Sequence, residues 1–186
     1  MTYLDLIARK SQSVSASGFF VPEEDLAPHL FPHQRDLTRW ALRRGRAALF
    51  ADTGLGKGPM LLEWARHVSK RGRVLILAPL SVGPQLQREG VKFGVDAQYR
   101  RMDDASLPIV ISNYEMRHRF RPEDFTGLVL DESSILKSQD GRTRNELIES
   151  WKACPYKLAC TATPSPNDFT ELGNHSEFLG LKTRAE

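Results

Sequence analysis

The chain has 186 residues, 40% of them hydrophobic and 26% charged, which suits one globular domain with a sizeable core and excludes a disordered or fibrous protein. Its net charge of +3 permits nucleic-acid binding without demanding it, since each local arginine cluster is explained equally well by solvated loops. The start lacks the pattern of a signal peptide and no apolar run could span a membrane, so we expect a cytoplasmic protein without a membrane partner.

Helical and strand patterns alternate along most of the chain. The first 25 residues predict a short helix from Tyr3 to Lys10 and a Ser-rich connector. Trp40 and Trp64 lie on apolar faces of helical patterns, which indicates core or domain-packing residues. Further helices are predicted at 58–70, 84–93, 142–153 and 166–179. Strands are predicted at 47–52, 73–79, 97–101, 108–114, 127–133 and 156–163.

Several of these strands are apolar at consecutive positions, most clearly from Val74 to Leu77 and from Leu128 to Leu130. Such runs are typical of strands that are covered on both faces, as in a parallel sheet. Strand–helix alternation then predicts an α/β fold with right-handed crossovers. Ligands of such sheets bind at the carboxyl ends of the strands, so the residues that follow each strand are the candidates for function.

The stretch "FADTGLGKGP" follows the first predicted strand and precedes a helix. Gly54 and Gly56 allow the backbone to turn its N–H groups inward, and Lys57 stands where the helix begins, at an end that favours anions. This context predicts a loop that holds nucleotide phosphates, with Lys57 reaching the β- and γ-phosphates. The alternative is a glycine-rich turn with a surface lysine.

Two further strands end in polar residues. Asp131 and Glu132 follow the strand "GLVL", and this pair suits a metal-linked carboxylate and a base that orients water. A helix N-cap aspartate with a first-turn glutamate is the alternative. Thr161 and Thr163 close the sixth strand, and Ser165 with the following Pro166 predicts the start of the last helix.

Taken in order, these segments resemble superfamily-two helicases, and more narrowly the Swi/Snf-like branch that includes helicases encoded by bacteriophages. The resemblance covers about residues 28 to 180. It rests on "FPHQ" (31–34), "ADTGLGKG" (51–58), "LAPLS" (77–81), "SNYE" (112–115), "DESS" (131–134) and "TATP" (161–164).

The resemblance implies a RecA-like P-loop NTPase domain that binds ATP and Mg²⁺. Gln34 matches the glutamine that contacts adenine, with Phe31 or His33 packing nearby. Asp131 matches the magnesium-linked aspartate and Glu132 the catalytic glutamate, which act together with Lys57. The phosphate loop corresponds to Thr53, Gly54, Leu55, Gly56, Lys57 and Gly58.

The resemblance also implies contacts with nucleic acid. Thr161 and Thr163 match the segment that couples the nucleotide state to the grip on nucleic acid. Ser81, Ser112 and Asn113 match strand ends that touch its backbone, where they could donate hydrogen bonds to phosphates. No base-reading helix is evident, so we expect sequence-independent binding, with DNA favoured over RNA.

Two departures from the family pattern stand out. Gly58 replaces the Thr or Ser whose hydroxyl is a direct magnesium ligand, so we expect weakened nucleotide binding and slow hydrolysis. Ser133 and Ser134 replace Ala-His or Ala-Asp, which puts communication with the coupling segment in doubt.

Helicases of this group bind ATP between two RecA-like domains, the second of which supplies an arginine finger worth about 10³–10⁵ in rate. The sequence predicts only the first of them: an N-terminal helix and connector (1–25), the RecA-like domain (26–165), and a helix leading towards a missing second domain (166–186). We therefore expect a motor domain that is a poor ATPase without a second domain in the same chain or in trans. The alternatives are a non-hydrolysing binding module of the same fold and, less favoured, an unrelated phosphate-loop enzyme such as a small-molecule kinase.

Overall fold

The computed structural model describes residues 16–137, 141–164 and 171–181. Its described part is built around one sheet of six strands, all parallel, in the order β1-β6-β5-β2-β4-β3. The strands are β1 (Arg46–Phe50), β2 (Val74–Ala78), β3 (Ala97–Tyr99), β4 (Ile109–Asn113), β5 (Gly127–Asp131) and β6 (Tyr156–Thr161). The predicted α/β class with a parallel, helix-covered sheet is therefore confirmed.

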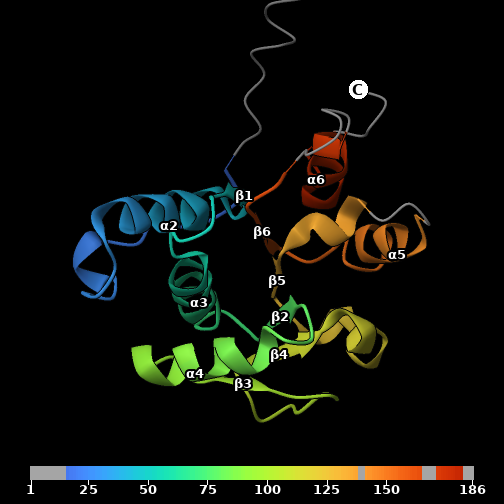
Figure 1. Ribbon diagram of the computed structural model, residues 1–186, viewed down its shortest axis with the longest axis horizontal. Helices are drawn as coiled ribbons and strands as arrows, with labels where there is room; N and C mark the ends of the chain where they lie inside the picture. The colour runs from blue at the N-terminus through green and yellow to red at the C-terminus, as the bar shows by residue number, and fades with distance from the viewer. Residues whose placement is uncertain (1–15, 138–140, 165–170, 182–186) are drawn as a thin grey trace, which may run out of the picture.

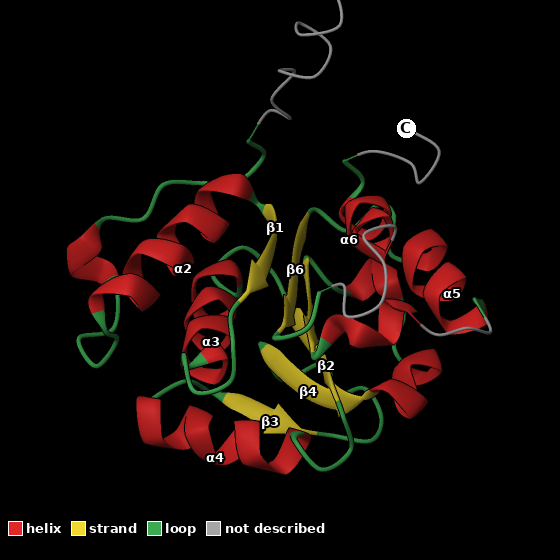
Figure 2. Cartoon of the chain, turned by 45° about the horizontal axis from the view of Figure 1, so that its top comes forward, coloured by secondary structure: helices red, strands yellow, loops and turns green. Residues whose placement is uncertain are grey.

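Helices cover both faces of the sheet (Figure 1). One face carries α2 (Pro32–Arg44), α3 (Lys57–Val68) and α4 (Gly83–Phe93), and the other carries α5 (Arg142–Ser150) and α6 (Glu171–Leu179). Short 3₁₀ segments lie at Glu23–Asp25, Tyr114–Arg119, Pro122–Asp124 and Ser133–Lys137. Figure 2 shows the strands between the two helical layers, with α4 beside α3.

Two hydrophobic clusters fill the spaces between these layers. Trp64 and Ile76 belong to the cluster under α2, α3 and α4, whereas Trp151 and Phe178 belong to the cluster under α5 and α6. The central strands β2 and β4 are buried along their whole length. This explains their consecutive apolar residues, because a strand covered on both faces has no solvent side.

The predicted elements agree with the structure except near the N-terminus. All six strands are present, several of them shorter at their carboxyl ends than predicted. The helical pattern around Trp40 corresponds to α2, whose bounds were not predicted and whose buried face includes the polar residues Gln34 and Thr38. Trp64 is fully buried and belongs to the core, whereas Trp40 is 47% exposed, so of its two predicted roles the exposure rules out the core and leaves domain packing.

The segments at the two ends of the described chain pack against the same domain. The N–H group of Phe19 donates to Leu42 O, and Val21 is buried in the first hydrophobic cluster. Phe178 of α6 is buried in the second cluster. The predicted helix from Tyr3 to Lys10 and the helix start at Ser165 and Pro166 lie outside the described residues. Within the described part of the chain, no helix is long and apolar enough to cross a membrane.

Candidate nucleotide-binding site

The sheet brings the predicted site residues to one edge. In the strand register, Phe50 at the end of β1 pairs with Thr161 of β6, and Cys160 pairs with Asp131 of β5. Three neighbouring strands therefore end side by side. The first, β1, leads into the loop, β6 ends with the Thr161 hydroxyl, and β5 ends with the Asp131–Glu132 pair. This is the edge at which open parallel sheets bind their ligands.

The loop of residues 51–56 connects β1 to α3. Gly54 and Gly56 have φ angles of 83° and 78°, in the left-handed region that favours glycine. Helix α3 begins at Lys57, so its first N–H groups face the loop. The Lys57 ammonium donates to Ala51 O at 2.8 Å and to Asp52 O at 3.2 Å. The loop thus combines free backbone donors at a helix start with a cation, the chemistry that phosphate groups require.

Gln34 joins the start of α2 to this loop. Its Oε1 accepts from the Phe31 N–H group at 3.0 Å, and its Nε2 donates to Leu55 O at 3.1 Å. A Cβ atom on Gly56 would overlap the Gln34 amide, so the close approach needs glycine. Phe31 is 64% exposed and its ring lies nearly parallel to that of His33, with centroids 6.1 Å apart. The geometry places an amide and an exposed aromatic ring beside the loop, where the adenine contact was predicted.

The acidic pair lies at the end of β5. Burial raises the pKa of Asp131 to about 6, and the negative charges of Glu132 and Glu89 add to this effect, against a backbone N–H group and the Lys57 ammonium. Burial makes the charged form of a carboxyl costly unless a cation approaches it. Asp131 Oδ1 also accepts from the Glu132 N–H group at 3.1 Å.

Glu132 has an unusual backbone conformation, and its side chain is hydrogen-bonded to the neighbouring strand β6. Its φ of 53° makes it the one residue other than glycine with a positive φ in the described part of the chain. Thr161 Oγ1 donates to Glu132 Oε1 at 2.6 Å, and the Thr163 N–H group donates to the same hydroxyl at 3.1 Å. Strained backbone of this kind persists where surrounding contacts fix it, and it gathers at functional sites. Thr161 therefore fixes the direction of the Glu132 carboxylate.

The residues predicted to contact nucleic acid are placed differently from one another. Ser81 is exposed in the segment between β2 and α4. Ser112 is fully buried and its hydroxyl donates to Arg100 O at 2.7 Å, so it fastens the segment after β3 to β4. Asn113 is also buried, at 2% exposure, and its Oδ1 has no hydrogen-bond partner among the described residues. The surface role expected of the Ser112 hydroxyl does not agree with this geometry.

Three contacts near the site were not predicted from the sequence. The Tyr114 hydroxyl donates to Asp131 O at 2.8 Å and so supports the end of β5 from the neighbouring 3₁₀ segment. Ser133 Oγ lies 3.0 Å from His175 Nε2, which links the segment after Glu132 to α6. Glu89 of α4 lies against Gly58. All three contacts join segments far apart in the sequence, so no local pattern could indicate them.

Whether Mg²⁺ fits this site can be tested on its donor atoms. Glu89 Oε2 is buried without a hydrogen-bond partner, and a Cβ atom on Gly58 would overlap that oxygen. Mg²⁺ in phosphate sites takes one or two carboxylates and completes its shell with phosphate oxygens and water. No cluster of three or more metal-binding side chains occurs within the described residues, but a pair of carboxylates beside a phosphate loop meets this requirement. The residues present therefore fit a Mg²⁺–nucleotide complex.

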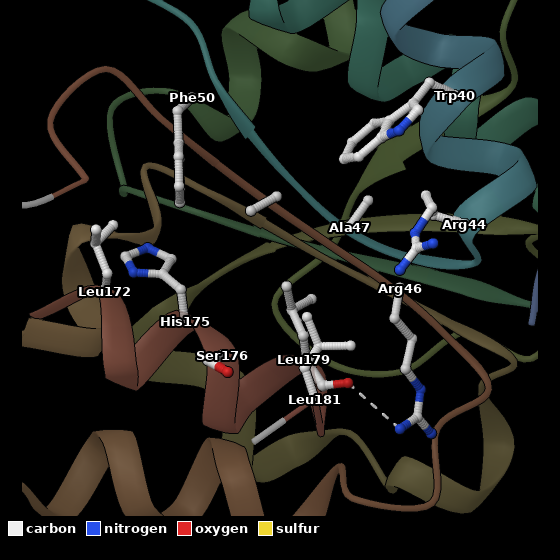
Figure 3. A pocket seen from close by; sticks show the side chains of 11 residues that line it. Trp40, Arg44, Arg46, Ala47, Phe50, Leu172, His175, Ser176, Leu179 and Leu181 are labelled. Atoms are coloured by element: carbon white, nitrogen blue, oxygen red, sulfur yellow. Dashed lines mark hydrogen bonds between the residues drawn. The ribbon is translucent and has the colours of Figure 1, made fainter. Parts of the chain in front are cut away.

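A separate groove lies on the other side of β1 (Figure 3). It has a volume of about 320 Å³ and is bordered by α2, β1 and α6, with Trp40 and Phe50 among its lining residues. Two of its lining residues are joined by a hydrogen bond, in which Arg46 Nη1 donates to Leu179 O at 3.4 Å. None of the predicted site residues lines this groove, so it is distinct from the loop and the acidic pair.

The strand order, the loop after β1 and the acidic pair after β5 together define a RecA-like domain. Comparison with solved structures supports this fold. The SWI2/SNF2 ATPase core of Sulfolobus solfataricus, solved in complex with double-stranded DNA, matches with a TM-score of 0.74 at 20% sequence identity, over 88% of this chain and 38% of that one.

Two helicases give similar matches. The UvsW helicase of bacteriophage T4 has a TM-score of 0.67 at 16% identity, over 98% of this chain and 66% of that one. The Hef helicase domain of Pyrococcus furiosus has a TM-score of 0.63 at 16% identity, and the match covers 81% of this chain and 36% of that one. The chain thus spans less than two thirds of the length of each of these structures. No protein-family model and no curated protein matches the sequence.

Proposed function

We propose that the chain is the first motor domain of an ATP-dependent DNA helicase or translocase of the Swi/Snf-like group. The observation that carries the proposal is the meeting of Lys57, the Asp131–Glu132 pair and Thr161 at one edge of the sheet. The helicase fold of the structural neighbours supports it. Because ATP and nucleic acid meet inside the cell, the proposal places the protein in the cytoplasm.

In the proposed function each residue has a distinct task. The N–H groups at the start of α3 bind phosphate oxygens, and Lys57 exchanges its two carbonyl partners for the β- and γ-phosphates. Gln34 and the Phe31 ring contact the adenine. Asp131 holds Mg²⁺, which when bound neutralises charge on the phosphates. Glu132 orients the attacking water, and Thr161 fixes the carboxylate that does so.

Hydrolysis by this domain alone is proposed to be slow. The arginine that stabilises the transferred phosphate comes from a second RecA-like domain, in the same protein or in trans, and its loss costs about 10³–10⁵ in rate. The non-hydrolysing module of the same fold remains a second candidate, because Gly58 offers no hydroxyl to the metal. Single-turnover hydrolysis after a second motor domain is supplied separates the two, since only a motor gains rate.

Nucleic acid is proposed to bind through its backbone. Ser81 is exposed in the segment after β2, and Arg101 is exposed after β3. Such contacts give no base readout and depend on released counterions, so affinity should fall steeply with salt. Fluorescence anisotropy with labelled duplexes of unrelated sequence at 50 and 200 mM salt tests this. Equal affinity for all duplexes and a marked salt dependence are expected, whereas absence of binding at low salt would contradict the DNA-binding part.

A further inference from the structure

Gly58 and Glu89 are complementary in space although they belong to different helices. Gly58 stands in the first turn of α3, where a related phosphate loop has a hydroxyl residue. Glu89 stands in α4, which packs beside α3 on the same face of the sheet (Figure 2). A Cβ atom on Gly58 would overlap Glu89 Oε2, so the carboxylate occupies the volume that a Ser or Thr side chain would fill.

The two oxygens of this carboxylate differ in their surroundings. Oε1 accepts from Gln85 Nε2 at 3.1 Å, one turn earlier on α4. Oε2 is buried and has no hydrogen-bond partner in the described part of the chain. The Glu89 side chain is only partly buried, but its Oε2 atom has lost contact with water without gaining a hydrogen bond, which is unfavourable. An approaching cation removes that cost, so this oxygen is suited to bind a metal ion.

The position of Glu89 relative to the other acidic group agrees with this. Its charge is near enough to Asp131 to contribute to the raised pKa of that carboxyl, after burial and Glu132. Glu89 of α4 lies against Gly58 in the first turn of α3, and Asp131 stands at the end of β5. Mg²⁺ accepts this number of carboxylates together with phosphates and waters.

We propose that Glu89 replaces the missing hydroxyl of the phosphate loop and supplies a carboxylate ligand to the Mg²⁺ that accompanies the nucleotide. This inference rests on the proposed ATP-binding function and adds a carboxylate ligand at the position where Gly58 offers no hydroxyl. Gly58 has no side chain, and the Glu89 carboxylate occupies the space that a side chain at position 58 would need.

The proposal predicts how Mg²⁺ should affect nucleotide binding. A bare carboxylate at the loop repels phosphates, whereas a metal between them turns repulsion into attraction. The quantity to measure is the ratio of the dissociation constants of a non-hydrolysable ATP analogue in EDTA and in Mg²⁺, by calorimetry. For the unaltered protein we expect a ratio of about tenfold or more, the scale of one good charge-assisted contact.

Glu89→Gln should reduce this ratio to about one to two, with binding in EDTA unchanged or tighter. Glu149→Gln, at an exposed glutamate of α5 on the opposite face, is the matched control and should keep the full ratio. The double variant Gly58→Ser/Glu89→Gln restores the hydroxyl ligand and should recover the ratio. Thermal melting without nucleotide checks that every variant is folded.

Spectroscopy gives a second readout that does not depend on affinity. With Mn²⁺ in place of Mg²⁺, electron–nuclear double resonance counts the water ligands of the bound ion. Glu89→Gln should gain one water relative to the unaltered protein. If Glu89 only supports α4, binding in EDTA and in Mg²⁺ will weaken together and the ratio will not change, which would overturn the inference while the proposed function stands. If the unaltered protein binds no nucleotide in either buffer, the proposed function itself fails, and this inference fails with it.

Discussion

The Thr161 hydroxyl donates a hydrogen bond of 2.6 Å to the Glu132 carboxylate, across two neighbouring strand ends and a sequence separation of 29 residues. The bond joins the residue proposed to orient the attacking water to the segment proposed to sense nucleic acid. A shift of the segment after β6 would therefore move the carboxylate directly. This contact is a direct physical link between the two proposed activities.

Thr161→Val should break this link at little cost in volume. Two hydrogen bonds disappear, to Glu132 Oε1 and from the Thr163 N–H group, so we expect a loss of about 1–2 kcal/mol in the free energy of unfolding. Urea denaturation measures it. Thr161→Ser keeps the hydroxyl and should stay closer to the unaltered protein. If Thr161→Val, which keeps the methyl group, is as stable as the unaltered protein and Thr161→Ser is not, the methyl group and not the hydroxyl is what matters.

Gln34→Leu should weaken nucleotide binding and its base preference together. The substitution removes the amide that joins Phe31 and Leu55 and that is proposed to contact adenine. One or two lost hydrogen bonds correspond to about tenfold in affinity for ATP, with less effect on GTP. Calorimetric titration with both nucleotides measures this.

Asp36→Ala serves as the control for that experiment, because Asp36 is exposed on the same helix. It should leave both affinities unchanged. An equal loss for ATP and GTP in Gln34→Leu would assign Gln34 to loop support alone and contradict the adenine contact.

A buried charge cluster on α3 predicts an acid-dependent stability. Burial alone would raise the pKa of Glu63, but hydrogen bonds from His67, Arg66 and the Ala27 N–H group outweigh it and lower the pKa to about 2. Since a lowered carboxyl pKa stabilises the folded state above the unfolded value of 4.5, this contribution is complete at neutral pH. It is lost as the pH falls from about 4.5 to about 2.

Glu63→Gln should therefore cost about 2–3 kcal/mol at pH 7, measured by urea denaturation. The difference from the unaltered protein should shrink steadily below pH 4.5. Glu24→Gln, at an exposed position, is the control and should show no such difference. A gap between Glu63→Gln and the unaltered protein that stays constant down to pH 3 would contradict the assignment of the effect to Glu63.

The sequence was sufficient to predict a parallel sheet and the polar residues that follow its strands, but not the order of the strands in the sheet. Runs such as Val74 to Leu77 indicate buried parallel strands because both faces need apolar side chains. The glycine and lysine spacing after β1 likewise indicates a phosphate loop, since each residue type serves a local backbone purpose. The bounds of α2 were not predicted, and two polar residues, Gln34 and Thr38, occupy its buried face.

Contacts between segments far apart in the chain could not be predicted from the sequence. Glu89 lies 31 positions after Gly58, and nothing in its local pattern indicates that it fills the space of a missing side chain. The burial of Ser112 has the same origin, because the acceptor of its hydroxyl, Arg100 O, comes from another segment. Trp40 shows the opposite case, since its helical pattern suggested burial and the packing leaves it 47% exposed.

The central claim is that the loop after β1 binds the phosphates of ATP through Lys57. Its most direct test is calorimetric titration of a non-hydrolysable ATP analogue with Mg²⁺ into the unaltered protein, Lys57→Ala and the exposed-site control Lys70→Ala. The account predicts saturable binding to the unaltered protein and to Lys70→Ala, and a loss of at least about 100-fold for Lys57→Ala, since charge-assisted contacts to two phosphates disappear. Equal affinity in all three proteins, or no binding in any, would contradict it.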